Sequence, residues 1–272
     1  MSSHFDCYSF ANGSYSCSVN RLFIKLHLGH QNNLTAAETS KILNYTQELH
    51  EVVRYRSKKE IESSAQNILD EVDYKSKSVN LENICSLLAN EMGLIVEHNV
   101  EPTYDPSILG TLSFSPIKIK IFRSTNHNRE RFTLAHEIGH LILGHGEFMK
   151  EEYTQNSDFR LENYSPDVVR EIVRMEWQAN YFASCLLLPA DSLKQEFLRV
   201  AHIIDLRNKG RGFLYVDDQP VNLQNYRMVT NRLKLIFRAS QQAVTIRLNE
   251  IGYLTDARKN YSHNIETFLR SD

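Results

Sequence analysis

The sequence has no long apolar run and no recognisable signal peptide. No window approaches the roughly 18 apolar residues that a membrane-spanning helix needs. The opening segment, MSSHFDCYSFANGSYSCSVN, also lacks a basic start followed by an apolar core. We therefore expect a soluble, cytoplasmic protein that makes no use of a membrane.

The sequence also lacks an excess of charge of one sign. Its 31 basic and 33 acidic residues give a formal net charge of −2, so no global field attracts nucleic acid or an anionic surface. The cysteines have no C-x2-C spacing and are too few to staple 272 residues, which predicts reduced structural thiols. They are Cys7, Cys17, Cys85 and Cys185.

Apolar spacing divides the chain into three predicted regions. Residues 1–57 form a partly helical N-terminal extension of unknown role, in which LTAAETSKILNYTQELHEVV has a helical stripe. Residues 58–192 form the core, and residues 193–272 form a mainly helical C-terminal region. The C-terminal region contains a helix over SLKQEFLRVAHIID, a strand at GFLYV, and two helices, QNYRMVTNRLKLIF and QQAVTIRLNEIG, broken at RAS.

The core region mixes helical and strand periodicity. Two helical stripes, EIESSAQNILDEV and VNLENICSLLANEMG, precede the alternating segments TLSFS and IKIKIF. In the second of these segments Ile117, Ile119 and Ile121 share one face. The prediction is an α+β fold with a small mixed or antiparallel sheet packed on helices.

The segment RFTLAHEIGHLILGHG, residues 131–146, places polar side chains inside an otherwise apolar helix. Residues four apart share a helical face, so His136 and His140 can direct both imidazoles at one ion. Glu137 lies about 100° round from His136, near enough to hold a water without ligating the ion. Metal-assisted hydrolysis needs this combination, because a carboxylate must take the proton of the attacking water.

The surroundings of this HExxH pattern decide its meaning, since the pattern alone also arises by chance. Gly139 in mid-helix costs roughly 1 kcal/mol relative to alanine unless another element packs closely there. Two histidines and a glutamate in a buried helix also need partners, because unpaired polar burial is costly. A metal ion is the simplest such partner.

A catalytic zinc site takes three protein ligands and a water. His145 lies five residues after His140, about 140° round the helix, and Gly144 is expected to end the helix first, so we do not favour His145 as the third ligand. Glu176, in EWQANYFASCLLLP, can complete the coordination from a second helix. Asn180, one turn further on, can then accept a hydrogen bond from a ligand histidine.

Together, RFTLAHEIGHLILGH and EWQANYFASCLLLP resemble the ImmA/IrrE family of metallopeptidases, and RASQQAVTIRLNEIGYL is similar to the usual ending of that family. The likeness runs from about Glu60 to Leu254. It implies a zincin-like core with His136, His140 and Glu176 as zinc ligands and with Glu137 as general base.

The resemblance also implies a function. It points to a zinc-dependent endopeptidase that cleaves a specific cytoplasmic regulator, such as a helix-turn-helix repressor, and so acts in transcription regulation. In zincin-like enzymes an edge strand pairs with extended substrate, and Ile117, Ile119 and Ile121 mark the candidate strand, although an ordinary half-buried strand explains the same pattern equally well. A tyrosine or histidine is also needed to stabilise the transition state, and Tyr153, Tyr164, Tyr181 and several histidines remain open for that role.

Two other hypotheses remain. In the first, the protein is a regulator that binds DNA or a protein partner and has a structural or vestigial zinc site. Residues 221–260 carry an excess of basic residues over two helices split by a turn, although a solvated basic face is the simpler interpretation. In the second, the histidines are satisfied within a helical core and bind no metal.

Overall fold

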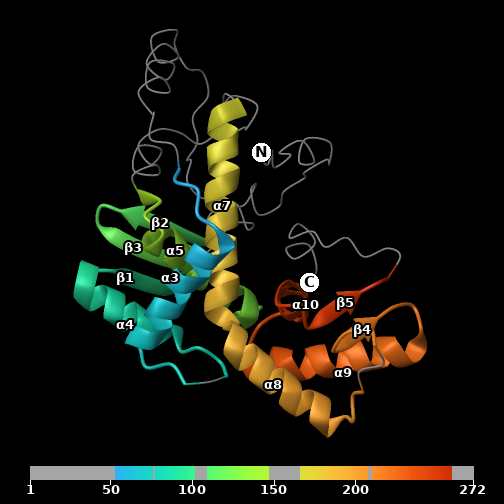
Figure 1. Cartoon of the computed structure of the whole chain (residues 1–272). Coiled ribbons are helices and arrows are strands. Elements are labelled where there is room, and N and C mark those ends of the chain that lie inside the picture. Colours follow the sequence, from blue (N-terminus) through green and yellow to red (C-terminus); the bar gives the residue numbers. More distant parts are fainter. Residues whose placement is uncertain (1–52, 76, 102–108, 147–165, 208–209, 259–272) are drawn as a thin grey trace.

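The computed structural model describes residues 53–75, 77–101, 109–146, 166–207 and 210–258 (Figure 1). Most of the predicted N-terminal extension, including Cys7 and Cys17, lies outside these ranges. Cys85 and Cys185 are buried, free thiols. Within the described ranges, none of the helices combines the length and the apolar character that a bilayer crossing requires.

Two short helices open the described part of the chain, and local signals set their ends. Helix α3, Lys58–Glu71, begins at a capping box in which Ser57 and Glu60 satisfy each other's backbone N–H groups. Helix α4, Leu81–Met92, is capped by Asn80 and ends at Gly93, which has φ of +73°. Both helices bury their apolar stripes in the main core, as their spacing predicts.

The strands form a three-stranded mixed sheet. Its members are β1, Ile95–Val100; β2, Gly110–Phe114; and β3, Ile117–Phe122. The order is β1-β3-β2, with β3 parallel to β1 and antiparallel to β2.

The central position of β3 corrects one prediction. The expectation that IKIKIF has a free edge for substrate was wrong, because both edges of β3 are paired within the sheet. Ile119 and Ile121 face the buried side and are almost completely covered, while Ile117 is partly buried. Ile119 and Ile121 are core residues of a central strand and Ile117 packs against the core, so the reason for proposing them as substrate-binding residues no longer holds.

Two helices form the centre of the fold. Helix α5, His127–Ile142, lies between the sheet and the long helix α7, Pro166–Leu187 (Figure 1). A Cβ atom placed on Gly139 of α5 would lie 3.2 Å from the Ala179 carbonyl oxygen of α7 and 3.0 Å from Phe182 Cδ1. The helices therefore cross with almost no side chain between them, which explains the glycine in the middle of α5.

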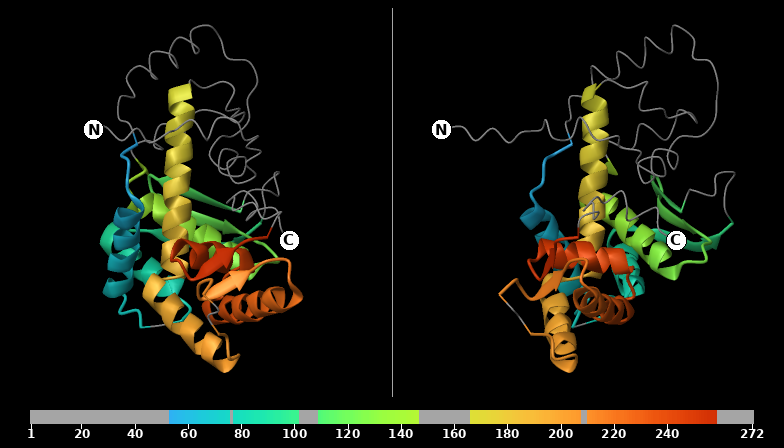
Figure 2. Two further views of the ribbon diagram at one scale, coloured as in Figure 1. Left: turned by 45° about the vertical axis from the view of Figure 1, so that its right-hand side comes forward. Right: turned by 90° about the vertical axis from the view of Figure 1, so that its right-hand side faces the viewer.

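The C-terminal elements pack around the far end of α7 (Figure 2). Helix α8, Ala190–Ile203, follows Pro189, and helices α9, Pro220–Phe237, and α10, Gln241–Glu250, come next. Strands β4, Leu214–Val216, and β5, Leu254–Asp256, pair in parallel. The predicted boundary between residues 192 and 193 falls inside α8, so this helix joins the two regions. The mixed α+β class is confirmed.

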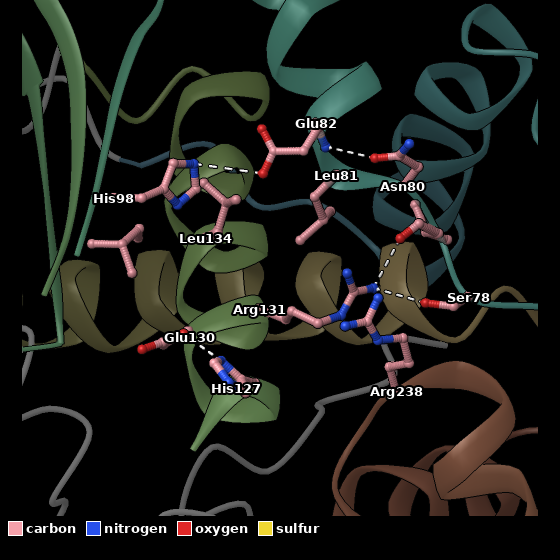
Figure 3. Close-up of a pocket in the computed structure, with 12 residues that line it drawn as sticks. Ser78, Asn80, Leu81, Glu82, His98, His127, Glu130, Arg131, Leu134 and Arg238 are labelled. Atoms are coloured by element: carbon pink, nitrogen blue, oxygen red, sulfur yellow. Dashed lines mark hydrogen bonds and ion pairs between the residues drawn. The ribbon is translucent and has the colours of Figure 1, made fainter. Parts of the chain in front are cut away.

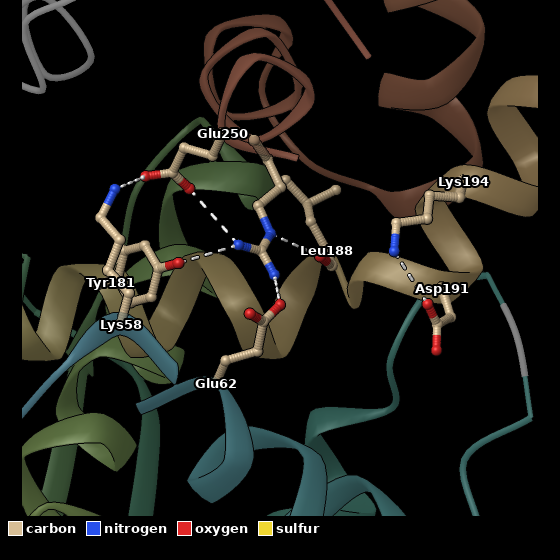
Figure 4. Close-up of polar contacts among 8 residues, drawn as sticks. Lys58, Glu62, Tyr181, Leu188, Asp191, Lys194 and Glu250 are labelled. Carbon is tan, nitrogen blue, oxygen red and sulfur yellow. Dashed lines mark hydrogen bonds and ion pairs between the residues drawn. The ribbon is translucent and has the colours of Figure 1, made fainter. Parts of the chain in front are cut away.

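A buried arginine ties three of these helices together (Figure 4). Arg247 of α10 is 1% exposed; it pairs with Glu62 of α3 and donates to the Leu188 carbonyl oxygen at the end of α7. Its Nη1 atom lies 3.4 Å from the Tyr181 hydroxyl and 3.5 Å from Glu250. Several acceptors thus compensate a charge that would otherwise be costly to bury.

Candidate metal centre

Helix α5 brings the two histidines together. Asn126 caps the start of the helix by accepting from the Arg129 N–H, and the helix continues to Ile142. His136 and His140, one turn apart, are both buried, and their Nε2 atoms lie 2.9 Å from each other. The spacing of four residues therefore produces the predicted convergence of the two imidazoles.

Helix α7 adds a carboxylate to the pair. The Glu176 oxygens lie 3.5 Å from His136 Nε2 and 3.5 Å from His140 Nε2. Ligand atoms on a tetrahedral zinc ion, each about 2.0–2.1 Å from it, are roughly 3.3 Å apart. The distances among these three side chains fit that spacing, and the three residues form a candidate metal site.

Each histidine has a partner on the side away from the cluster. His136 Nδ1 lies 3.0 Å from Asn180 Oδ1, which is the contact predicted for Asn180. His140 Nδ1 lies 3.0 Å from His145 Nδ1. The Nδ1 atoms are thus occupied by neighbouring side chains, and the Nε2 atoms face each other and Glu176.

Glu137 is a buried carboxyl with an unusual environment. Its side chain is fully buried, and no described residue hydrogen-bonds to either of its oxygens. Burial raises the pKa of Glu137 to about 8. A buried carboxyl without a hydrogen-bond partner is costly unless a cation or water meets it, so this side chain, next to His136 in the sequence, fits a site that holds a metal ion with bound water.

His145 lies behind His140 and is not part of the cluster. The turn after α5, in which Gly144 has φ of +71°, places this ring against the Nδ1 side of His140. Burial lowers the pKa of His145 to about 4, so the ring is neutral at pH 7. His145 Nε2 lies 3.1 Å from Gln178 Oε1, a contact that the sequence analysis missed. The only signal in the sequence was a glutamine within the apolar surroundings of α7.

The structure gives a position for only one of the three tyrosines considered for transition-state stabilisation. The Tyr181 hydroxyl lies at Arg247, in the cluster at the end of α7. Tyr153 and Tyr164 lie outside the described residues. Tyr181 therefore has a structural partner in Arg247.

Strand β2, like β3, contacts α5. A Cβ atom on Gly110 would lie 2.6 Å from Thr133 Cγ2, and one on Gly146 would lie 2.7 Å from Phe114 Cδ1. The start of β2 therefore touches the middle of α5, and its end touches the turn that follows α5.

A pocket whose lining does not include His136, His140 or Glu176 lies between the start of α4 and the first half of α5 (Figure 3). Arg131, near the start of α5, donates to Ser78 Oγ and to the Val79 carbonyl oxygen there. Glu82 and Glu130 also line the pocket, so its charge is mixed.

Comparison with known proteins agrees with this geometry. Residues 119–249 match a family model, Peptidase_M78, described as the IrrE N-terminal-like domain. These residues belong to the ImmA/IrrE family. The match includes β3, the HExxH helix, α7 and the C-terminal helices up to α10, and it is narrower than the likeness predicted from the sequence.

The other comparisons are less informative. No curated protein matches the chain. One solved structure that aligns with the chain is a Mycobacterium tuberculosis transcriptional regulator, with 15% sequence identity and a TM-score of 0.43. The similarity covers 70% of this chain and 46% of that one, so the chain spans less than half the length of that protein.

Proposed function

We propose that this protein is a zinc-dependent endopeptidase that cleaves a specific cytoplasmic regulatory protein. One observation carries the proposal: the buried convergence of His136, His140 and Glu176, with the fully buried Glu137 next to His136 in the sequence. Two nitrogens and a carboxylate oxygen are the donor set of many hydrolytic zinc sites. The substrate class, a helix-turn-helix repressor, follows from the resemblance to the ImmA/IrrE family.

Both a metal ion and side chains of the protein would contribute to peptide hydrolysis. Zinc, when bound, would supply a bound water of lowered pKa and polarise the scissile carbonyl. Glu137 would take the proton of that water on a carboxylate oxygen and pass it to the leaving amine. Positive charge beside Glu137 favours its ionised form and so opposes the effect of burial on its pKa. Asn180 and His145 would hold the two imidazoles in place.

The substitution Glu137→Gln tests the mechanism. The variant should bind zinc and fold like the wild type, while cleavage falls by about 10²–10⁴-fold, because a general base has been removed. The assay co-expresses the protein with the product of the neighbouring gene and follows fragments of that product. Zinc content and circular dichroism check the fold.

A matched control is available on α8. Glu196 is also a buried glutamate, and its ion pair with Arg199 lies away from the histidines. The variant Glu196→Gln should cleave at the wild-type rate. Cleavage that persists undiminished in Glu137→Gln would rule out the proposed mechanism.

The alternative of a DNA-binding regulator finds less support in the C-terminal helices. Most of α10 is buried, including Val244, Thr245 and Leu248, so it lacks the exposed face of a recognition helix. Arg247 is inside the core, and Arg258 pairs with Asp256. Metal analysis combined with a salt-dependent DNA-binding assay separates the two functions. Tight, salt-sensitive binding without proteolysis would favour the regulator.

A further inference from the structure

A chain of hydrogen bonds leads from the N-terminal side of the described structure to the candidate metal site. Gln178 of α7 donates through Nε2 to the Arg54 carbonyl oxygen, at 2.9 Å. Its Oε1 atom lies 3.1 Å from His145 Nε2, and His145 Nδ1 lies 3.0 Å from His140 Nδ1. The side chains of Gln178, His145 and His140 are all buried, so the two contacts among them are shielded from bulk water.

The chemistry of the groups fixes the direction of each hydrogen bond. A carbonyl oxygen only accepts, so the amide nitrogen of Gln178 must face Arg54 and the amide oxygen must face His145. The reversed amide would bring two acceptor oxygens to 2.9 Å and is excluded for that reason. His145 Nε2 must therefore carry the proton that is donated to Gln178.

The remaining protons follow from the single proton of a neutral imidazole. Because His145 has its proton on Nε2, its Nδ1 atom is an acceptor. His140 Nδ1 must then be the donor across the 3.0 Å contact. His140 Nε2 consequently has a lone pair, which points towards His136 Nε2 and Glu176 Oε1.

We propose that Gln178 and His145 are positioning residues that fix the tautomer of His140 and present its Nε2 lone pair to the metal. The inference rests on the proposed metal centre and deepens it. Outer partners of this kind orient metal-ligating histidines and raise their basicity. Here the outer partner is itself a histidine, and a glutamine two residues from the third ligand sets its tautomer.

The hydrogen bonds from Arg54 through Gln178 and His145 to His140 form a relay. This relay begins in a segment that is remote in sequence from the metal site. Residues 53–57 lie against α7 and the end of α5, where Arg174 donates to the Val53 carbonyl oxygen and Arg56 donates to the Leu143 carbonyl oxygen. The Arg54 carbonyl thus has a defined place, 124 positions before Gln178. Correct docking of this segment is what orients the amide of Gln178.

Nuclear magnetic resonance of the metal-free protein tests the relay directly. With ¹⁵N-labelled histidine, long-range proton–nitrogen correlations at neutral pH show which ring nitrogen is protonated, and variants lacking one histidine assign the signals. The proposal expects a proton on Nε2 of His145 and on Nδ1 of His140. In Gln178→Met the preference of His145 should be lost. A proton on Nδ1 of His145 in the wild type would overturn the proposal.

Metal affinity gives a second, independent readout. Gln178→Met should weaken Zn²⁺ binding by about 10–100-fold and change the visible absorption of bound Co²⁺. The double variant Gln178→Met/His145→Leu should bind no more weakly than His145→Leu alone, because Gln178 acts through His145. Fully additive losses would contradict the relay, and so would unchanged affinity and spectrum in Gln178→Met.

A matched control separates this role from general packing. Gln241→Met removes another partly buried glutamine, whose Nε2 donates to Thr230 Oγ1 far from the histidines. This variant should keep wild-type Zn²⁺ affinity. If the wild type binds neither Zn²⁺ nor Co²⁺, the proposed function fails, and the tautomers of the metal-free protein still decide the relay.

Discussion

Each candidate histidine ligand is oriented from the side opposite the cluster. Asn180 holds His136 from α7, and His145 holds His140 from the turn after α5. A histidine ring without such a partner can rotate or take the wrong tautomer, and metal affinity then falls. At the scale of single residues, the site therefore depends on side chains that would never touch a metal.

The variant Asn180→Ala tests this dependence. Loss of the acceptor at His136 Nδ1 should weaken Zn²⁺ binding by about 10–100-fold, measured by competition with a chromophoric chelator. Asn180→Asp is the matched control, since its carboxylate still accepts from Nδ1–H and should keep the affinity near wild type. Equal affinity in Asn180→Ala and wild type would show that Asn180 has no orienting role.

At the scale of elements, the site is assembled where α5 and α7 cross. The histidines lie on α5 and the glutamate on α7, so the distance between the helix axes sets the distance from nitrogen to carboxylate. Gly139 permits this approach, because a Cβ atom there would lie only 3.2 Å from the Ala179 carbonyl oxygen. One glycine thus links helix packing to the geometry of the candidate ligands.

The variant Gly139→Ala should therefore lose both stability and metal affinity. Alanine gains about 1 kcal/mol in helix propensity, but overpacking against backbone costs about 1–3 kcal/mol. We expect a lower melting temperature of the metal-free protein and weaker Zn²⁺ binding, measured by calorimetry and chelator competition. A more stable variant with unchanged affinity would show that the two helices can accommodate a methyl group at this position.

At the scale of the whole molecule, buried polar anchors hold distant segments together. Arg247 connects α10 to Glu62 of α3 and to the backbone at the end of α7 (Figure 4). Arg174 and Gln178 bind the segment before α3 to α7 in the same way. These contacts tie both ends of the described chain to the helix that carries Glu176.

Removal of the Arg247 charge should destabilise the whole fold. Arg247→Met leaves several acceptors without a donor and should cost about 3 kcal/mol, the lower end of the range for breaking a buried pair, because Glu62 is partly exposed. Urea denaturation in the presence of a chelator measures this loss without a contribution from metal. Arg232→Met, at an exposed position of α9, should cost far less. Similar losses in the two variants would contradict a special role for Arg247.

Local patterns were enough to predict most elements of the fold. Alternation in IKIKIF predicted a strand, and the caps at Ser57 and Gly93 agree with the predicted helices. The order of the strands could not be predicted, because the alternation of one strand does not reveal its neighbours. That is why β3 was mistaken for an edge strand.

The sequence by itself determined that His136 and His140 converge, because their spacing matches one turn of a helix. It also indicated Glu176 and Asn180, whose spacing on a second helix is again one turn. Only the tertiary structure decided how close the two helices come, through the contact of Gly139 with Ala179. It alone placed Gln178 between Arg54 and His145, since hydrogen bonds across 124 and 33 positions depend on chain packing and leave no periodic trace in the sequence.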